Sequence, residues 1–169
     1  MISLILCEGK SDAVFLSYYL EKTAQWKIMK KGPKEFAINI DEGKGESAYW
    51  YRRGDEVLLI CSVGGKTKFK CFFDDKIIEA IKQTSFFTKV AIVRDSDDDT
   101  SLEIAQSMND LLAPLCNNIV LDQWSKHSYT NGYGEQKSID ILIQVVPKDQ
   151  QGALVLTSHI LPTQLRLSI

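Results

Sequence analysis

Runs of apolar residues alternate along the chain with segments of helical periodicity. Continuous apolar runs of strand length occupy residues 2–7, 56–62 and 89–93, and a fourth strand is predicted over 138–146, where Pro147 stops it. Continuous runs are typical of strands that are buried on both faces of a sheet. Apolar residues at helical spacing predict helices over 13–22, 71–83 and 102–115. This alternation predicts an α/β fold with a mostly parallel central sheet of about four strands, flanked by helices.

Polar residues that suit a helix N-terminus precede two of the predicted helices. Ser11 or Asp12 is expected to cap the helix over 13–22, and Thr100 or Ser101 the helix over 102–115. The residues of the first helix that we expect to pack inward are Val14, Phe15, Leu16 and Tyr18. Each helix closely follows a predicted strand, as in a strand–turn–helix unit.

Residues 23–55 are expected to form an insert in this alternation. Residues 35–40 alternate apolar and polar positions, and residues 47–52 are rich in aromatic side chains, with a loop between them. This pattern predicts a hairpin-like element attached to the main sheet. We therefore expect one domain over 1–150. Residues 117–137 are predicted to be a long loop with a short strand at 119–121, and residues 151–169 a nearly uncharged apolar tail.

Length and composition are typical of one soluble globular domain. The chain has 169 residues, of which 44% are hydrophobic and 25% charged, and its formal net charge is −2. That charge excludes a global basic field, so a polyanion would have to be held by a local patch or a metal ion. Four cysteines without CxxC spacing argue against structural zinc or a disulfide framework. We find no secretory signal or spanning apolar stretch, and expect a cytoplasmic protein with no membrane partner.

Acidic residues follow two of the predicted buried strands. Glu8 closes the first strand, and Asp95 and Asp97 close the strand over 89–93. The carboxyl ends of parallel strands border the crevice where open α/β sheets bind ligands. Carboxylates held close together repel one another, and a hard divalent ion with oxygen ligands relieves that repulsion. We therefore expect a Mg²⁺ (or Mn²⁺) site whose predicted ligands are Glu8, Asp12, Asp95, Asp97 and Asp99.

The spacing of these acids supports the same site but has a simpler alternative. In an extended segment, Asp95, Asp97 and Asp99 would share one side of the chain. Asp12 lies in the first turn of the helix that follows Glu8 and is expected to face the same crevice. The alternative is a solvated acidic turn before a helix, where capping and the helix dipole favour Asp.

A glycine–lysine loop follows the predicted strand over 56–62. Gly64 and Gly65 let the backbone approach a ligand closely, and Lys66 and Lys68 place positive charge on the same loop. The spacing is not that of a P-loop, so ATP hydrolysis by that route is not expected. The alternative is a tight turn with a solvated charge run. The residues predicted to bind phosphate or nucleic acid are Lys10, Gly64, Gly65, Lys66, Lys68 and Arg94.

Taken in order, three motifs resemble those of Toprim domains, and the similarity covers about residues 2–146. The motifs are Glu8-Gly9-Lys10-Ser11-Asp12, Val63-Gly64-Gly65-Lys66 and Asp95-Ser96-Asp97. The resemblance implies a Rossmann-like sheet, a glutamate at Glu8 that acts as general acid or base or as a metal ligand, and a DxD pair at Asp95 and Asp97 that binds Mg²⁺. Asp12 matches a second acid of the nuclease branch, so the small stand-alone or nuclease-type (overcoming-lysogenization-defect-like) Toprim proteins are the most similar group.

The function expected from this resemblance is Mg²⁺-dependent hydrolysis of phosphodiester bonds in DNA or RNA, with Glu8 and Lys66 as catalytic residues. One alternative is a non-catalytic module on the same scaffold that binds nucleic acid, a partner protein or a second copy of itself in repair, recombination or RNA processing. A receiver-like domain is a weaker alternative, because the acidic run follows the third predicted strand rather than the first.

Overall fold

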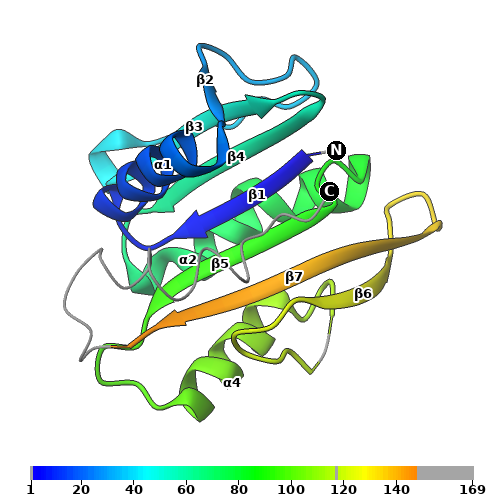
Figure 1. Cartoon of the computed structure of the whole chain (residues 1–169). Coiled ribbons are helices and arrows are strands. Elements are labelled where there is room, and N and C mark those ends of the chain that lie inside the picture. The colour runs from blue at the N-terminus through cyan, green and yellow to red at the C-terminus, as the bar shows by residue number, and fades with distance from the viewer. Residues whose placement is uncertain (1, 117, 148–169) are drawn as a thin grey trace.

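The described part of the chain forms a seven-stranded mixed sheet with helices on both faces. The computed structural model describes residues 2–116 and 118–147. The sheet has the order β2-β3-β4-β1-β5-β7-β6, as Figure 1 shows. Its four parallel strands are β1 (Ile2–Cys7), β4 (Glu56–Val63), β5 (Lys89–Asp95) and β7 (Gln136–Val146). The predicted α/β class and the parallel centre of about four strands are therefore confirmed.

Successive parallel strands are added to the sheet on opposite sides of β1. The strand that follows β1 in the parallel set, β4, lies on one side of it, and the next one, β5, lies on the other. Cys7 at the end of β1 is level with Ser62 of β4 and with Val93 of β5. The carboxyl ends of β1 and β5 therefore meet at a topological switch point, the place where open α/β sheets bind ligands.

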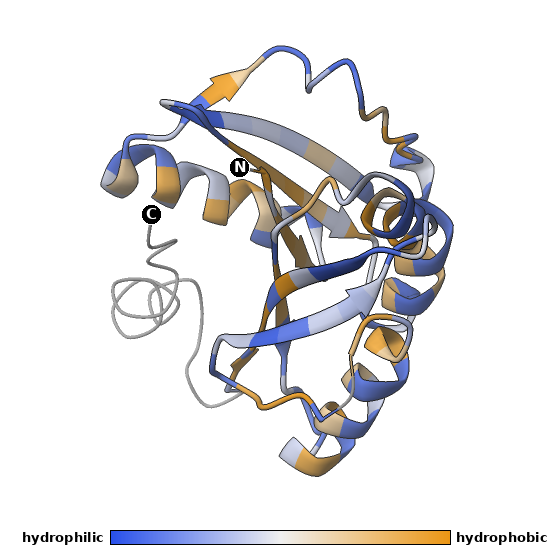
Figure 2. Cartoon of the chain, turned by 90° about the vertical axis from the view of Figure 1, so that its right-hand side faces the viewer, coloured by the Kyte–Doolittle hydropathy of each residue, from blue (hydrophilic) through white to orange (hydrophobic). Residues whose placement is uncertain are grey.

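Helices cover the two faces of the sheet with separate apolar cores (Figure 2). Helix α1 (Lys10–Ala24) packs on one face through Ala13, Leu16 and Leu20. The other face is covered by α4 (Ser101–Leu112) and by a continuous helical segment. That segment consists of the 3-10 turn η2 (Lys66–Lys68), α2 (Phe69–Phe72), the π turn η3 (Phe73–Ile77) and α3 (Ile78–Thr84). The three predicted helices are thus present, and the middle one contains a π turn that the sequence pattern did not predict.

The start and the inward face of α1 differ from the prediction. Gly9 holds the cap position, and Asp12 Oδ2 accepts a hydrogen bond from the Gly9 N–H at 2.9 Å. Val14 and Tyr18 are 50% and 62% exposed, so the prediction that they pack inward was wrong. Apolar residues occur on more than one side of this helix, and the side that approaches the sheet is formed by Ala13, Leu16, Ser17 and Leu20. At α4, Thr100 caps the helix as one of the two predicted residues, and its side chain accepts from the Glu103 N–H.

The insert pairs differently from the predicted hairpin. Residues 35–40 form no strand, and their apolar side chains instead pack against the core. Strand β3 (Glu46–Arg53) pairs antiparallel with β4 on one side and with the short β2 (Lys27–Met29) on the other. The hairpin therefore joins β3 to β4 through Gly54 and Asp55. Alternation alone cannot select the partner of a strand, which depends on contacts between distant residues.

The long loop predicted over 117–137 contains a strand. In that range β6 (Ser125–Thr130) pairs antiparallel with β7 at the sheet edge, while Leu121 makes only an isolated bridge to Ile143. Strand β6 is mostly polar because an edge strand has solvent on one side, and this hid it from a search for apolar runs. The tail predicted over 151–169 lies outside the described residues. Within the described ranges, no helix is long and apolar enough to cross a membrane.

Candidate acidic site at the carboxyl ends of the parallel strands

The structure brings Glu8 and Asp95 together at the switch point. Glu8 directly follows β1, and Asp95 is the last residue of β5. The Asp95 backbone N–H donates to Glu8 Oε1 at 3.2 Å. The Glu8 carboxylate thus lies against the backbone of Asp95, although 87 residues separate the two in the sequence. Their closeness follows from the parallel pairing of β1 with β5, which brings both strand ends to the same edge.

Burial, followed by the crowding of negative charge, raises the pKa of both carboxyl groups. Partial burial and the nearby Asp95 raise the pKa of Glu8 from the ordinary 4.5 to about 7, while the Asp95 N–H and Arg94 work in the opposite direction. Burial, and then the charges of Asp12 and Asp97, also raise the pKa of Asp95. A carboxyl group that is half protonated near neutral pH can accept or donate a proton. It also marks a place where a cation would be stabilised by the surrounding negative charge.

The glycine loop is bonded to the backbone of this site. The Gly64 and Gly65 N–H groups both donate to the Glu8 carbonyl oxygen, at 3.1 and 2.8 Å. Gly64 has a φ of +85°, and a Cβ atom at this position would lie 2.2 Å from the Lys44 carbonyl oxygen. A side chain at position 64 would therefore collide with the insert. Because both N–H groups are used by Glu8, this loop positions Glu8 and has no free amide at these residues for a phosphate.

Lysine and arginine side chains pair with the acids that follow β5. Lys66 Nζ lies 2.7 Å from Asp99 Oδ2 and 3.4 Å from Asp97 Oδ2. Arg94, which is only 5% exposed, pairs with Asp99 and donates to Ser107 Oγ at 3.3 Å. The hydrogen bond from Lys66 lowers the pKa of Asp99, and Arg94 adds to this effect. Lys66 therefore holds the acidic turn in place, and Arg94 lies beneath that turn, away from solvent.

The acidic turn is not extended, in contrast to the sequence prediction. Asp97 has a left-handed φ of +45°, and the Asp99 N–H donates to the Ser96 carbonyl oxygen at 2.8 Å. The chain therefore turns immediately after β5, so the side chains of Asp95, Asp97 and Asp99 do not share one side of an extended segment. The sequence pattern could not reveal this, since a run of Asp residues is compatible with both a strand end and a turn.

Two of the predicted lysines differ in their surroundings. Lys68 donates to the Lys44 carbonyl oxygen at 2.9 Å and so ties the glycine loop to the insert. Lys10 is exposed in the first turn of α1, immediately beyond Glu8 and Gly9. Of the lysines predicted to bind phosphate, Lys10 and Lys66 are therefore the two whose surroundings suit this role best. Lys44 carried no signal in the sequence, because only the fold brings it to this loop.

The donors present at the strand ends suit a hard divalent ion, but their side chains are not arranged as a ligand set. All of the predicted ligands are carboxylates, the oxygen donors that Mg²⁺ prefers. Among the described residues, however, no three His, Cys, Asp or Glu side chains converge on a point where they could hold an ion. Asp12 is engaged by Gly9, and Asp97 and Asp99 by Lys66. Coordination by more than Glu8 and Asp95 would require these side chains to leave their present partners.

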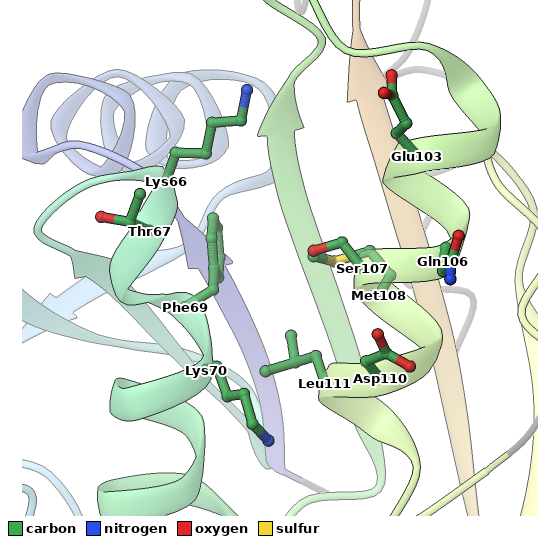
Figure 3. A pocket seen from close by; sticks show the side chains of 10 residues that line it. All are labelled: Lys66, Thr67, Phe69, Lys70, Glu103, Gln106, Ser107, Met108, Asp110 and Leu111. Atoms are coloured by element: carbon green, nitrogen blue, oxygen red, sulfur yellow. The ribbon is translucent and has the colours of Figure 1, made fainter.

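A groove runs beside the acidic turn, between η2–α2 and α4 (Figure 3). Its volume is about 410 Å³, and Lys66, Phe69 and Lys70 line one side, while Glu103, Ser107 and Leu111 line the other. The figure shows Lys66 and Glu103 at the same end of the groove. Lys66 thus belongs both to the groove and to the acidic turn. No sequence pattern predicted this groove, because its two walls come from helices that a strand separates along the chain.

Comparisons with known proteins give a structural match only. Neither a protein-family model nor a curated protein matches this chain. The crystal structure of a hypothetical protein from Pyrococcus horikoshii OT3 superposes with a TM-score of 0.57 at 20% sequence identity. The match covers 83% of this chain and 54% of that protein, so this chain spans about half the length of its structural neighbour. At this identity the likeness shows the fold alone.

Proposed function

We propose that this chain is a Toprim-like protein that hydrolyses phosphodiester bonds in DNA or RNA with the help of a divalent metal ion. The observation that carries the proposal is the contact between Glu8 and Asp95 at the switch point of the sheet. The order of the three motifs along the chain and the raised pKa of both carboxyl groups support it. The Toprim subtype of the α/β fold and the cytoplasmic compartment belong to this proposal.

Each residue of the site has a role in this proposal. Glu8 and Asp95 would hold Mg²⁺ or Mn²⁺. Asp12 and Asp97 would complete the set after leaving Gly9 and Lys66, and Asp99 after leaving Lys66. When bound, such an ion supplies charge for the phosphate oxygens and lowers the pKa of a water molecule. Glu8 takes the proton from the attacking water. Lys66, released from Asp97 and Asp99, holds a phosphate oxygen, and Arg94 keeps Asp99 in place.

The first experiment measures cleavage of single-stranded and duplex DNA and RNA with Mg²⁺ or Mn²⁺, together with calorimetric titration of each ion. We expect Glu8→Gln to reduce cleavage by about 100-fold or more, the usual effect of removing a general base. Asp95→Asn is expected to abolish measurable binding of the ion. Asp55→Asn is the matched control, because Asp55 is exposed in the β3–β4 turn. Wild-type protein that binds no divalent ion, and an Asp95→Asn variant with unchanged behaviour, would refute the proposal.

A second candidate function is a non-catalytic binding module on the same scaffold. The observation that favours it is the pairing of Lys66 with Asp97 and Asp99, since an ion pair neutralises these acids without a metal. The two candidates differ in turnover: a module binds nucleic acid or protein equally well with a chelator present and cleaves nothing.

A further inference from the structure

An exposed row of side chains extends along α1, and we name these residues the α1 stripe: Lys10, Val14, Tyr18 and Lys22. They are four residues apart, so they lie on one side of the helix. All four are exposed, and Val14 and Tyr18 are the two residues whose burial the apolar pattern wrongly predicted. The core-facing side of the helix is formed by other residues, Ala13, Leu16 and Leu20. The stripe is therefore not explained by packing among the described residues 2–116 and 118–147.

The α1 stripe begins at the acidic site and leads away from it. Lys10 lies two residues beyond Glu8, and Lys22 lies about 18 Å further along the helix at 1.5 Å per residue. A shallow hollow of about 600 Å³ with mainly apolar walls lies along the first half of the stripe. Its lining residues are Lys10, Ser11, Val14, Phe15 and Tyr18. This side of the helix thus presents an apolar surface between the positive charges of Lys10 and Lys22.

At the far end of the α1 stripe, the ammonium group of Lys22 lies over the ring of Tyr18. Lys22 Nζ lies 5.5 Å from the centre of the Tyr18 ring, which is cation–π distance. Glu21, which is also exposed, lies three residues after Tyr18 and seven after Val14, so its negative charge lies on the same side of the helix as the stripe. An exposed ring next to an exposed ammonium group is the combination that binds a base by stacking and its phosphate by charge.

We propose that the α1 stripe binds single-stranded nucleic acid and guides it to the acidic site, an inference that rests on the proposed function. Lys10 and Lys22 contact backbone phosphates, and a base stacks on Tyr18 while Val14 contacts its neighbour. A duplex does not fit this surface as well, because its bases are already stacked and their faces are not available. A protein partner, for which a stable interface takes about 20–30 residues a side, would need contacts well beyond these four side chains.

The experiment uses the full chain in a chelating buffer, so that binding is separated from cleavage. Fluorescence anisotropy measures the Kd of a labelled oligothymidylate and of a self-complementary DNA hairpin of equal length. We expect tighter binding of the oligothymidylate. Tyr18→Ala weakens it about tenfold, as expected for loss of one stacked base, and Tyr18→Phe keeps the affinity. Tyr133→Ala is the matched control, because Tyr133 is 78% exposed in the β6–β7 connection, and it leaves the Kd unchanged.

Salt dependence tests the role of the two lysines. Lys22→Ala is expected to reduce the slope of log K against log salt by about 0.7, the value for one phosphate contact on a single strand. Circular dichroism of each variant shows that α1 has remained folded.

Three outcomes would overturn the inference. The first is equal affinity for the oligothymidylate and the hairpin, and the second is an unchanged Kd in Tyr18→Ala. The third is a loss of self-association in Tyr18→Ala, seen by sedimentation, with oligothymidylate binding intact, which would make this side of α1 a protein interface. Failure of the proposed function is distinguishable, because absence of cleavage leaves Tyr18-dependent binding in chelating buffer unaffected.

Discussion

Glu8 is the single residue on which the chemistry of the site depends most. Its carboxyl group lies beside Asp95 and is partly buried, and these two features raise its pKa to about 7. The folded protein therefore binds a proton at Glu8 in a pH range where the unfolded chain, with an ordinary pKa of 4.5, has released it. Between these two values the free energy of unfolding falls as the pH rises, because ionised Glu8 is less stable in the folded state.

The variant Glu8→Gln removes this penalty. At pH 8 we expect it to raise the free energy of unfolding by about 1 kcal/mol, a value reduced from the full pKa shift because solvent screens the partly exposed carboxylate. At pH 5 the gain is smaller, since wild-type Glu8 is then mostly protonated in the folded state. Urea unfolding at both pH values, in the presence of a chelator, measures the difference. Glu35→Gln, at an exposed position of the insert, is the control, and a gain independent of pH would contradict the assignment to Glu8.

At the scale of single residues, the sequence predicted which residues lie at the acidic site better than it predicted the contacts that they make. The sequence placed Glu8 and Asp95 at the ends of two parallel strands, and their contact depends on β1 and β5 being neighbours in the sheet. It could not predict that Arg94 would be buried against Asp99, or that Lys68 would bond to the insert. Such contacts depend on the direction of each side chain at the end of its strand, which no sequence pattern specifies.

Among the structural elements, the loop after β4 determines how the insert meets the site. Gly64 touches the Lys44 carbonyl so closely that no other residue fits, and Lys68 bonds to the same carbonyl oxygen. Ser62 at the end of β4 donates to the neighbouring Gly45 carbonyl oxygen at 3.0 Å. The insert is thus fastened to the loop that holds Glu8.

Gly64→Ala tests this contact. We expect it to lower the free energy of unfolding by about 2–4 kcal/mol, because the new methyl group adds overpacking against Lys44 to the strain of a left-handed residue. The control is Gly54→Ala, which has a φ of +57° but no atom within 4 Å of the added Cβ, so only the conformational cost of about 1–2 kcal/mol applies. Denaturant midpoints measure both. Equal losses in the two variants would show that the contact with the insert has no energetic role.

Prediction of the elements succeeded where strands are buried on both faces. The four parallel strands were recognisable because each is a nearly continuous apolar run between covering helices. The edge strand β6 was not recognisable, because its residues are mostly polar. The pairing of β3 was not recognisable either, because it depends on contacts with residues that are distant in the sequence.

In the whole molecule, a largely buried ion pair connects strand β3 to the helical layer. Glu46 of β3 is buried and lies 2.5 Å from Lys76 Nζ in the π turn η3. Lys76 also donates to the Asn39 carbonyl oxygen at 2.7 Å, and Glu46 Oε2 accepts from the Asp41 N–H at 2.7 Å. The irregular part of the insert is therefore held by the same two side chains that join β3 to the helices.

Lys76→Met leaves the charge of Glu46 buried without a partner. We expect a loss of about 3 kcal/mol in the free energy of unfolding, the usual result of breaking one half of a buried pair. The double variant Lys76→Met/Glu46→Gln should recover much of this loss, because the neutral amide needs no counter-charge and can still accept from Asp41. Urea unfolding of the single and double variants measures the coupling. If the effects of Lys76→Met and Glu46→Gln on the free energy of unfolding simply add in the double variant, the two side chains are not coupled and this pair does not join the two layers.

The sequence by itself determined the α/β class, the four parallel strands and the position of the acidic residues at two strand ends. These features are encoded locally, in apolar runs, helical spacing and the residue that follows each strand. Only the tertiary structure decided that Glu8 contacts Asp95, that Lys66 pairs with the acidic turn and that Val14 and Tyr18 remain exposed. The physical reason is that each of these depends on atoms brought together from distant parts of the chain, and the order of strands in the sheet, not the order of residues, decides which atoms meet.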